Sequence, residues 1–406
     1  MQLLFADSVP QRTVVDLESR GHRCVVEPTL AADDLPGRIA GFDILVVRST
    51  KVSGAVFEAA DRLALVIRAG AGTNTIDTTA AAERGVLVAN VPGRNADAVA
   101  ELTLGLLLAI DRRIADNVAD LRNGHWDKST YSKADGLLGT TMGIIGLGSI
   151  GLCVAERAVA FGIHVQTLAR AGRAPDVTAR AEALGVTMCD PLPELLSSSD
   201  IVSLHVPSAT GTRHLVDEAF LGHLQPGAIL INTSRGDVVD EDALLKALDA
   251  GAVRVGLDVF ADEPTSGTAE WSSRLGQHPA VVATHHIGAS TRQAQLAIAD
   301  GVAEIIDAFA AGESRSCVNL TPRRLGSVTL SLRHVDRVGV LARVLYLLSE
   351  ADLNVEHMEN RIFDGGHAAI ASIDVDGPVS DDLLADLAAV PHVLGVSAAR
   401  LRDDAT

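Results

Sequence analysis

The stretch from Thr141 to Gly151 constrains the fold of this chain more than any other. A short apolar run at 142–145 meets a Gly-x-Gly-x-x-Gly turn, and an apolar-periodic segment over 154–161 follows it. This order predicts a buried strand, a tight turn and a helix. In that context such a glycine pattern binds the pyrophosphate of a dinucleotide.

Each glycine of the pattern has a separate expected role. Gly146 would permit the tight turn, Gly148 would let a pyrophosphate approach the backbone, and Gly151 would let the helix pack close to the strand. The pyrophosphate would lie on the unpaired N–H groups at the helix start, around Ser149 and Ile150. The alternative is a glycine-rich turn that binds nothing.

Composition limits the classes of protein to consider. The chain has 406 residues, 47% of them hydrophobic and 3% aromatic, with a net charge of −18. That length allows two or three domains with aliphatic cores. The negative charge argues against non-specific nucleic-acid binding and against an anionic membrane surface. An anionic substrate would therefore need a local cationic pocket.

The N-terminus lacks the basic segment of a signal peptide, and the most apolar run, 102–110, is too short to cross a bilayer. The cysteines form no Cys-x-x-Cys pair, and we expect all four to be reduced, buried thiols. They are Cys24, Cys153, Cys189 and Cys317. These features predict a cytoplasmic protein.

Residues 1–95 alternate short apolar runs with helical or loop stretches, as in a mostly parallel sheet covered by helices on both faces. Ligands collect beyond the carboxyl ends of such strands, so Arg48 and Arg68 are candidates for holding an anion. The alternative is two surface arginines paired with nearby acids. The expected strands are 3–6, 24–27, 44–48, 65–69 and 87–90.

One long helix is expected over 96–121, and a second α/β block over 139–289. Polar residues recur at the ends of its later strands, where a nicotinamide ring would lie. A helix over 290–311 would return the chain to the first block. The strands expected in the second block are 142–145, 163–168, 201–205, 228–232, 254–258 and 281–284.

Two strand ends supply groups for acid–base chemistry. His286 follows one strand and Glu263 follows its neighbour, and a carboxylate bonded to one ring nitrogen leaves the other nitrogen for proton transfer. Arg235 can hold a substrate carboxylate at two points.

The alternatives are a helix-capping or core pair of His285 and His286, and a helix-start acid at Glu263. A metal site is disfavoured, because adjacent histidines point apart and no further ligands stand at metal spacing.

After a linker over 312–324 the pattern changes. A strand from 328, a helix over 338–348, a hairpin at 364–366, a helix from 381 and a strand over 393–398 give the order β-α-β-β-α-β. This order predicts a ferredoxin-like domain.

Together these motifs resemble the D-isomer-specific 2-hydroxyacid dehydrogenases, and within that family the members that oxidise 3-phosphoglycerate and carry a C-terminal ACT domain. The resemblance implies two Rossmann-like or flavodoxin-like parallel-sheet domains and a ferredoxin-like ACT domain. It places the substrate domain at 1–95 and 290–321, the cofactor domain at 96–289 and the ACT domain at 326–406. The segments that carry it are 47–52, 68–77, 90–101, 143–151, 231–240, 257–264 and 286–291.

The resemblance also implies residue roles. Arg235, Glu263 and His286 match the family's catalytic set, and Asp258 matches the residue that contacts the nicotinamide amide. The substrate-binding groups match Arg48 and Arg68 and the backbone of Ala71 and Gly72. The implied cofactor contacts are Gly146, Gly148, Ser149, Ile150, Gly151, Arg170, Val206, Pro207, Thr233, Ser234, Arg235, Asp258 and His286.

Two positions depart from the family pattern. Members that prefer NAD place an acid at the end of the second cofactor strand, where this chain has Ala169, followed by Arg170 and, nearby, Arg173. An arginine at this place accommodates a 2′-phosphate, so we expect NADPH to serve at least as well as NADH. His285 stands where the family commonly has proline.

In the tail, His334, Asp336 and Asn354 match the effector positions of serine-sensing ACT domains, although those members often carry asparagine in place of Asp336. The alternative is a dimerisation module without a ligand. The family suggests a homodimer through the cofactor domain, with ACT pairing giving a homotetramer.

The expected activity is hydride transfer between a D-2-hydroxy acid and NAD or NADP, with 3-phosphoglycerate as substrate in the first step of serine synthesis. One alternative is an NADPH-preferring reductase of hydroxypyruvate, glyoxylate or another 2-keto acid. The other is a non-catalytic, nicotinamide-sensing regulator.

Overall fold

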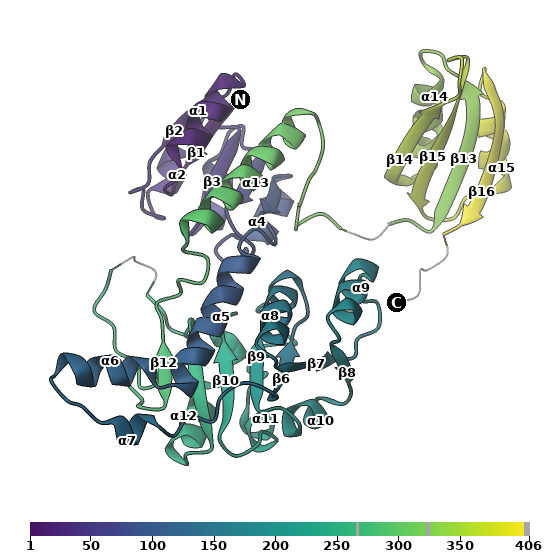
Figure 1. The fold of residues 1–406 in the computed structure, drawn as a ribbon. Helices are drawn as coiled ribbons and strands as arrows, with labels where there is room; N and C mark the ends of the chain where they lie inside the picture. Colours follow the sequence, from purple (N-terminus) through teal and green to yellow (C-terminus); the bar gives the residue numbers. More distant parts are fainter. Residues whose placement is uncertain (265–267, 322–324, 402–406) are drawn as a thin grey trace. The chain divides into compact units, whose positions relative to one another are not determined.

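The structure is a computed structural model that describes residues 1–264, 268–321 and 325–401. Its contacts divide the chain into two compact units, Met1–Asn319 and Leu320–Thr406. The first unit contains two parallel sheets and the second contains one antiparallel sheet (Figure 1).

The first sheet has the order β2-β1-β3-β4-β5, and all its pairs are parallel. The order reverses between β1 and β3, which makes the carboxyl ends of these two strands a topological switch point. The helices α1 and α13 pack on one face, and α2, α3 and α4 pack on the other. The bounds are β1 Gln2–Phe5, α1 Gln11–Ser19, β2 Arg23–Val26, α2 Leu35–Arg38, β3 Ile44–Val47, α3 Gly54–Ala59, β4 Leu65–Arg68, α4 Thr78–Glu83, β5 Leu87–Asn90 and α13 Arg292–Ala310.

The second sheet has the order β12-β11-β10-β9-β6-β7-β8 and is also parallel. It reverses between β6 and β9, beside the glycine turn. The helices α5, α8 and α9 cover one face, and α10, α11 and α12 cover the other. The bounds are β6 Thr141–Ile145, α8 Ser149–Ala160, β7 His164–Leu168, α9 Pro175–Ala183, β8 Thr187–Cys189, α10 Leu192–Ser197, β9 Ile201–Leu204, α11 Glu218–Gly222, β10 Ala228–Asn232, the 3-10 turn Gly236–Val238, α12 Glu241–Asp249, β11 Val253–Leu257 and β12 Val281–Ala283.

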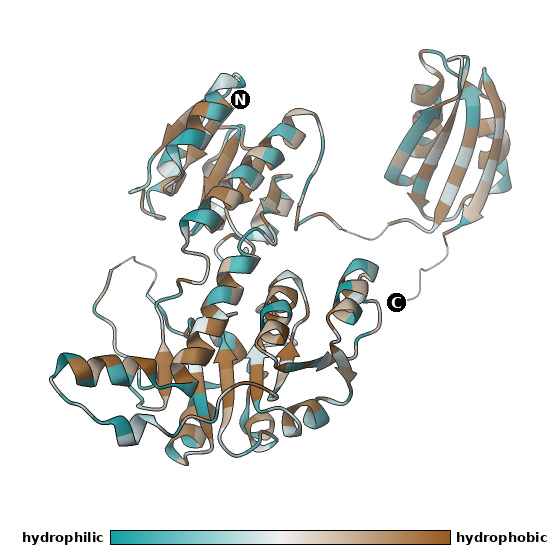
Figure 2. Ribbon diagram, viewed as in Figure 1, coloured by the Kyte–Doolittle hydropathy of each residue, from teal (hydrophilic) through white to brown (hydrophobic). Residues whose placement is uncertain are grey.

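The inner strands of both parallel sheets are strongly hydrophobic in Figure 2, because they are buried on two faces, whereas the edge strands β2, β8 and β12 are more exposed. The sequence prediction of six strands in the second sheet was one too few. The missing strand, β8, is short, lies at the sheet edge and has mostly exposed side chains, so it has no apolar run to mark it.

The prediction of one helix over 96–121 was wrong. Helix α5 (Ala96–Asp111) ends before Arg113, whose φ of 49° is left-handed, and α6 (Ile114–Arg122) starts in a new direction. A left-handed residue ends a right-handed helix. The apolar spacing runs on through Ile114, but no residue of α6 is buried. A short helix, α7, spans Lys128–Tyr131.

The second unit confirms the predicted β-α-β-β-α-β order, with the sheet order β14-β15-β13-β16. One aliphatic core joins its sheet to its two helices. The bounds are β13 Val328–Val335, α14 Val340–Glu350, β14 Asn354–Ile362, β15 Ala368–Asp376, α15 Asp381–Ala388 and β16 Val393–Arg400.

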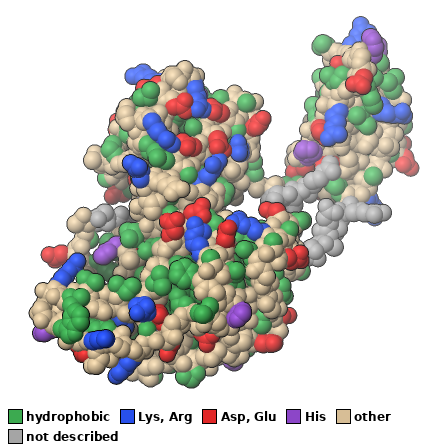
Figure 3. Space-filling view, viewed as in Figure 1, with side chains coloured by type: hydrophobic (Ala, Val, Ile, Leu, Met, Phe, Trp, Pro, Cys, Tyr) green, Lys and Arg blue, Asp and Glu red, His purple; other side chains and the backbone are tan. Residues whose placement is uncertain are grey.

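All four cysteines lie in the described part of the chain and are free thiols, but the prediction that all are buried was wrong. Only Cys153 is buried, whereas Cys24, Cys189 and Cys317 are partly exposed. Among the described residues, no helix combines the length and apolar character needed to cross a membrane. Acidic and basic side chains intermingle over the face shown in Figure 3.

Candidate active site

The glycine turn joins β6 to α8 with the expected backbone geometry. Gly146 has a φ of +101°, and a Cβ there would lie 2.3 Å from the His205 carbonyl oxygen, so the turn requires glycine. A Cβ on Gly151 would lie 2.3 Å from the Gly146 oxygen, which shows how closely the helix packs. No atom lies within 4 Å of a Cβ placed on Gly148, so the backbone is open to a ligand there.

The connection after β10 is held by a buried amide. The Asn232 side chain is fully buried; its oxygen accepts from the backbone N–H and hydroxyl of Ser234, and its nitrogen donates to the Arg235 carbonyl. Thr233 is hydrogen-bonded to Thr103 of α5 at 3.0 Å. These bonds fix the direction in which the Arg235 side chain leaves the sheet.

His286 and Glu263 lie side by side. The Nδ1 atom of His286 is 2.7 Å from Glu263 Oε1. A carboxylate only accepts, so Nδ1 carries the hydrogen and Nε2 of the neutral ring holds the lone pair. The φ of His286 is +52°, a left-handed conformation that is uncommon outside glycine.

The neighbouring Asp258 holds the loop that carries His286. It is 1% exposed, and its oxygens accept from the Thr284 hydroxyl and from the N–H groups of Ile287 and Gly288. Its backbone carbonyl also accepts from the His286 N–H at 2.7 Å. The strained backbone at His286 is thus held from several sides. The contact of Asp258 with a nicotinamide amide stays a prediction.

The capping and core alternatives for the histidine pair were wrong. His285 and His286 are both exposed and both lie before α13 begins at Arg292. Glu263 lies in the connection after β11, and the helix-start alternative involves residues 265–267, outside the described residues.

Three arginines gather where the two sheets meet. A Cβ on Gly72 would lie 2.1 Å from Arg235 Nη2, so the loop after β4 touches the loop after β10. The Arg48 guanidinium is 3.5 Å from the Ser290 hydroxyl. Burial and the positive charges of Arg235 and Arg48 lower the pKa of Arg68 to about 10. The negative charge of Asp7 opposes this shift.

The arginine alternative, surface side chains paired with acids, does not describe this cluster. Within the described residues, Arg48, Arg68 and Arg235 form no salt bridge. Burial lowers the pKa of Arg235, while the charges of Glu263 and Asp237 raise it. The cluster is therefore a concentration of positive charge next to the His286–Glu263 pair, in a chain with a net charge of −18.

Two polar atoms of this region are buried without a partner. They are Nε of Arg68 and Oε2 of Glu263. Buried polar groups are nearly always hydrogen-bonded, so each of these atoms is free to bond a ligand. Ala71 is also oriented here, because the Asn90 side chain donates to its carbonyl at 2.5 Å. The next N–H, of Gly72, points the opposite way, since a trans peptide opposes C=O and N–H.

The expected adenine-side residues also follow strand ends. Ala169 and Arg170 are exposed directly after β7, and Arg173 donates to the Leu168 carbonyl at 2.7 Å. Val206 and Pro207 follow β9. Burial lowers the pKa of the preceding residue, His205, to about 4, so its ring is neutral at pH 7.

In the second unit the three expected effector residues do not behave alike. His334 is 1% exposed and bonds the Val335 carbonyl and Asn360 through its two ring nitrogens. Asp336 is exposed, and Asn354 is exposed and donates to Glu356 at 2.7 Å. The His334 side chain is therefore already occupied within one chain.

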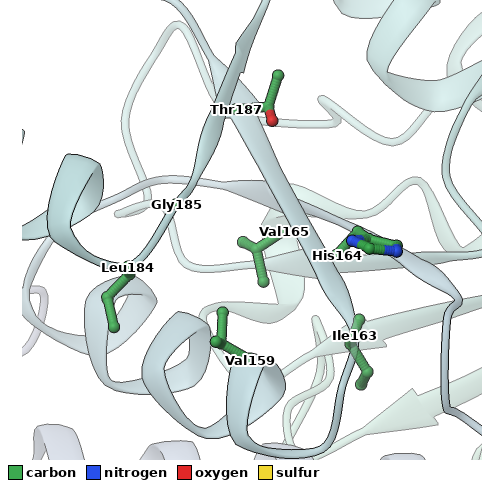
Figure 4. Close-up of a pocket in the computed structure, with 7 residues that line it drawn as sticks. All are labelled: Val159, Ile163, His164, Val165, Leu184, Gly185 and Thr187. Carbon is green, nitrogen blue, oxygen red and sulfur yellow. The ribbon is translucent and has the colours of Figure 1, made fainter.

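The pocket in Figure 4 is a separate feature. It has a volume of about 150 Å³ and is lined by the first residues of β7 and β8, with α8 beside them. It thus lies at the amino end of the strands, away from the glycine turn. The described residues contain no group of three or more side chains placed to hold a metal ion.

Comparison with known proteins agrees with this geometry. Residues 104–288 match the NAD binding domain of the D-isomer specific 2-hydroxyacid dehydrogenases, and residues 328–392 match the ACT domain. The chain is 42% identical over 273 residues to the hydroxypyruvate reductase of Thermotoga maritima, covering 67% of this chain and 86% of that enzyme. It is 37% identical over 335 residues to the D-3-phosphoglycerate dehydrogenase of Methanocaldococcus jannaschii, covering 81% of this chain.

The solved D-lactate dehydrogenase of Aquifex aeolicus, complexed with NAD and lactic acid, superposes with a TM-score of 0.66 at 26% identity. The match covers 79% of this chain and all of that structure. The chain belongs to the D-isomer specific 2-hydroxyacid dehydrogenase family and carries an ACT domain. It spans 62% of the length of the archaeal phosphoglycerate dehydrogenase.

Proposed function

We propose that the protein is an NAD(P)-dependent dehydrogenase that oxidises 3-phosphoglycerate to 3-phosphohydroxypyruvate in the cytoplasm, as the first step of serine synthesis. The observation that carries the substrate is the cluster of Arg48, Arg68 and Arg235, which lacks carboxylate partners in the described residues. A substrate with a carboxylate and a phosphate has two anionic ends for three guanidiniums, and guanidinium forks match both groups.

The chain's own residues supply the proton chemistry. The Nε2 atom of His286 would take the proton of the C2 hydroxyl, while Glu263 holds Nδ1 and stabilises the imidazolium that forms. Arg235, fixed by the turn after β10, would hold the carboxylate. A cofactor bound with its pyrophosphate on the glycine turn would supply, in its nicotinamide, the acceptor for the hydride that leaves C2.

The residues present fit such a cofactor. The open space at Gly148, the close packing at Gly151 and the start of α8 at Ser149 form a backbone cradle for a pyrophosphate. Thr233 and Asp258 follow the neighbouring strands at the same edge, where the cofactor's nicotinamide end would lie.

Replacing Arg68 with alanine tests the substrate. We expect the KM for 3-phosphoglycerate to rise on the order of ten- to a hundredfold, because one charged hydrogen-bond donor to the phosphate is lost. The KM for hydroxypyruvate and glyoxylate, which lack a phosphate, should change only a few-fold. Absorbance at 340 nm with both cofactors measures these rates.

Arg62→Ala is the matched control, since Arg62 precedes the same strand at its other end and bonds Asp43. Equal losses with all substrates in Arg68→Ala, together with faster wild-type turnover of hydroxypyruvate, would favour the 2-keto acid reductase instead. Cofactor binding without turnover of any substrate would favour the nicotinamide-sensing regulator.

We further propose that the second unit binds an amino acid such as serine between two copies of the chain, and that the first unit pairs through α6 and its neighbours. Trp126 and Leu138 are 81% and 85% exposed, and α6 has no buried residue. Large exposed apolar groups of this kind mark interaction surfaces. Sedimentation with and without L-serine checks both points: a dimer or tetramer with bound serine is expected, and a monomer that binds none contradicts them.

A further inference from the structure

Asp7 makes an unusual set of contacts directly after β1. Its Oδ2 atom accepts hydrogen bonds from three successive backbone N–H groups, those of Arg48 at 2.6 Å and of Ser49 and Thr50 at 3.2 Å each. The Thr50 hydroxyl also donates to the Ala6 carbonyl at 3.3 Å. The turn after β3 is thus closed around one carboxylate oxygen, as such backbone turns close around anions.

This turn lies at the switch point of the first sheet. β1 and β3 are neighbours with parallel register, so Asp7 and Arg48 leave the sheet side by side. Because Asp7 already occupies the N–H groups of residues 48–50, an incoming anion meets the Arg48 side chain rather than these amides. The Arg48 guanidinium lies 3.5 Å from the hydroxyl of Ser290, which precedes α13.

Asp7 also enters the charge balance of the arginine cluster. Within the described residues, the charges that act on Arg68 are those of Arg48 and Arg235, which repel it, and that of Asp7, which attracts it. A negative charge that acts on Arg68 offsets part of the repulsion from Arg48 and Arg235 and, for the same reason, competes with an anionic ligand. Asp7 therefore has two opposing effects on substrate binding. Its hold on the 48–50 turn favours binding, and its negative charge weakens binding.

We propose that Asp7 is the positioning residue of the substrate site: it holds the 48–50 turn so that Arg48 faces the anion, at the cost of some electrostatic attraction. This proposal rests on the proposed function, in which Arg48 binds the substrate. In this role Asp7 acts through the backbone of residues 48–50 and not through a contact of its own with the substrate.

Two substitutions separate the two effects. Asp7→Asn keeps an oxygen that can accept the three N–H groups and removes the charge, whereas Asp7→Ala removes both. For Asp7→Ala we expect the calorimetric Kd for 3-phosphoglycerate to rise about tenfold, with kcat at saturation within a few-fold of wild type. For Asp7→Asn we expect a Kd equal to or below that of wild type.

Asp43→Asn is the matched control. Asp43 precedes β3, accepts from the Gln2 N–H at 2.7 Å and lies at the opposite end of the same strand from Arg48. The Asp43→Asn substitution should lower thermal stability without changing the Kd for 3-phosphoglycerate. A general structural role for Asp7 would make its variants behave like this control.

Wild-type binding by Asp7→Ala, or equal weakening in Asp7→Asn and Asp7→Ala, would overturn the positioning role. Titration of the same proteins with sulfate separates this inference from the proposed function. If wild type binds sulfate but not 3-phosphoglycerate, the proposed substrate is wrong. In that case, sulfate binding that is weaker in Asp7→Ala but not in Asp7→Asn would still support the role of Asp7.

Discussion

Replacing His286 with alanine is expected to lower kcat about a thousandfold, because positioned acid–base groups contribute on that order. Binding of the nicotinamide cofactor should be nearly unchanged, since the glycine turn after β6 is built without His286. Steady-state kinetics at 340 nm and a calorimetric titration with NADPH measure the two quantities separately. The expected signature is a loss in kcat with cofactor affinity retained.

His285→Ala is the control for this experiment. His285 is the adjacent residue, is exposed and forms no hydrogen bond within the described residues, so its removal should change kcat less than twofold. The kcat of Glu263→Gln should lie between those of His286→Ala and His285→Ala. Glutamine can still accept a hydrogen bond from His286 Nδ1, but it has no charge to stabilise a protonated ring. Near-normal turnover in His286→Ala would remove the histidine from the mechanism.

The second large effect concerns the cofactor. Wild type is expected to use NADPH at least as efficiently as NADH, because the residue after β7 is Ala169 and the next is the exposed Arg170. Ala169→Asp should shift the ratio of kcat/KM values toward NADH by about a hundredfold, since a carboxylate repels the 2′-phosphate and can bond the ribose hydroxyls.

Ala183→Asp introduces the same charge at the exposed end of α9 and should leave the cofactor ratio unchanged. Arg170→Ala should lower kcat/KM for NADPH and leave kcat/KM for NADH unchanged. A wild-type enzyme with a strong preference for NADH would contradict the expectation, and would show that Arg170 and Arg173 do not face the adenosine ribose.

The sequence predicted most of the site because its parts are local. Apolar runs mark these strands, and each candidate group comes within three residues of a strand end: Arg48 after β3, Arg235 after β10 and His286 after β12. Parallel strands bring their carboxyl ends to one edge. The pairing of His286 with Glu263 follows from the adjacency of β11 and β12.

The errors occur where the local signal is weak. The strand β8 is short and exposed, and α6 continues an apolar spacing although its residues reach no core. Arg113 adopts a left-handed backbone conformation that arginine does not favour, so its residue type does not mark the helix break. Residues that act by binding backbone, such as Asp7 and Asn90, were missed because main-chain partners leave no pattern in the sequence.

The sequence by itself determined the glycine turn, the order of strands and the identity of the groups that follow them, because each depends on neighbouring residues. Only the tertiary structure decided how these groups combine. It brought Gly72 against Arg235, left Nε of Arg68 without a partner, and closed the 48–50 turn around Asp7. These contacts join residues far apart in the chain, and their energies depend on burial and distance, which folding alone establishes.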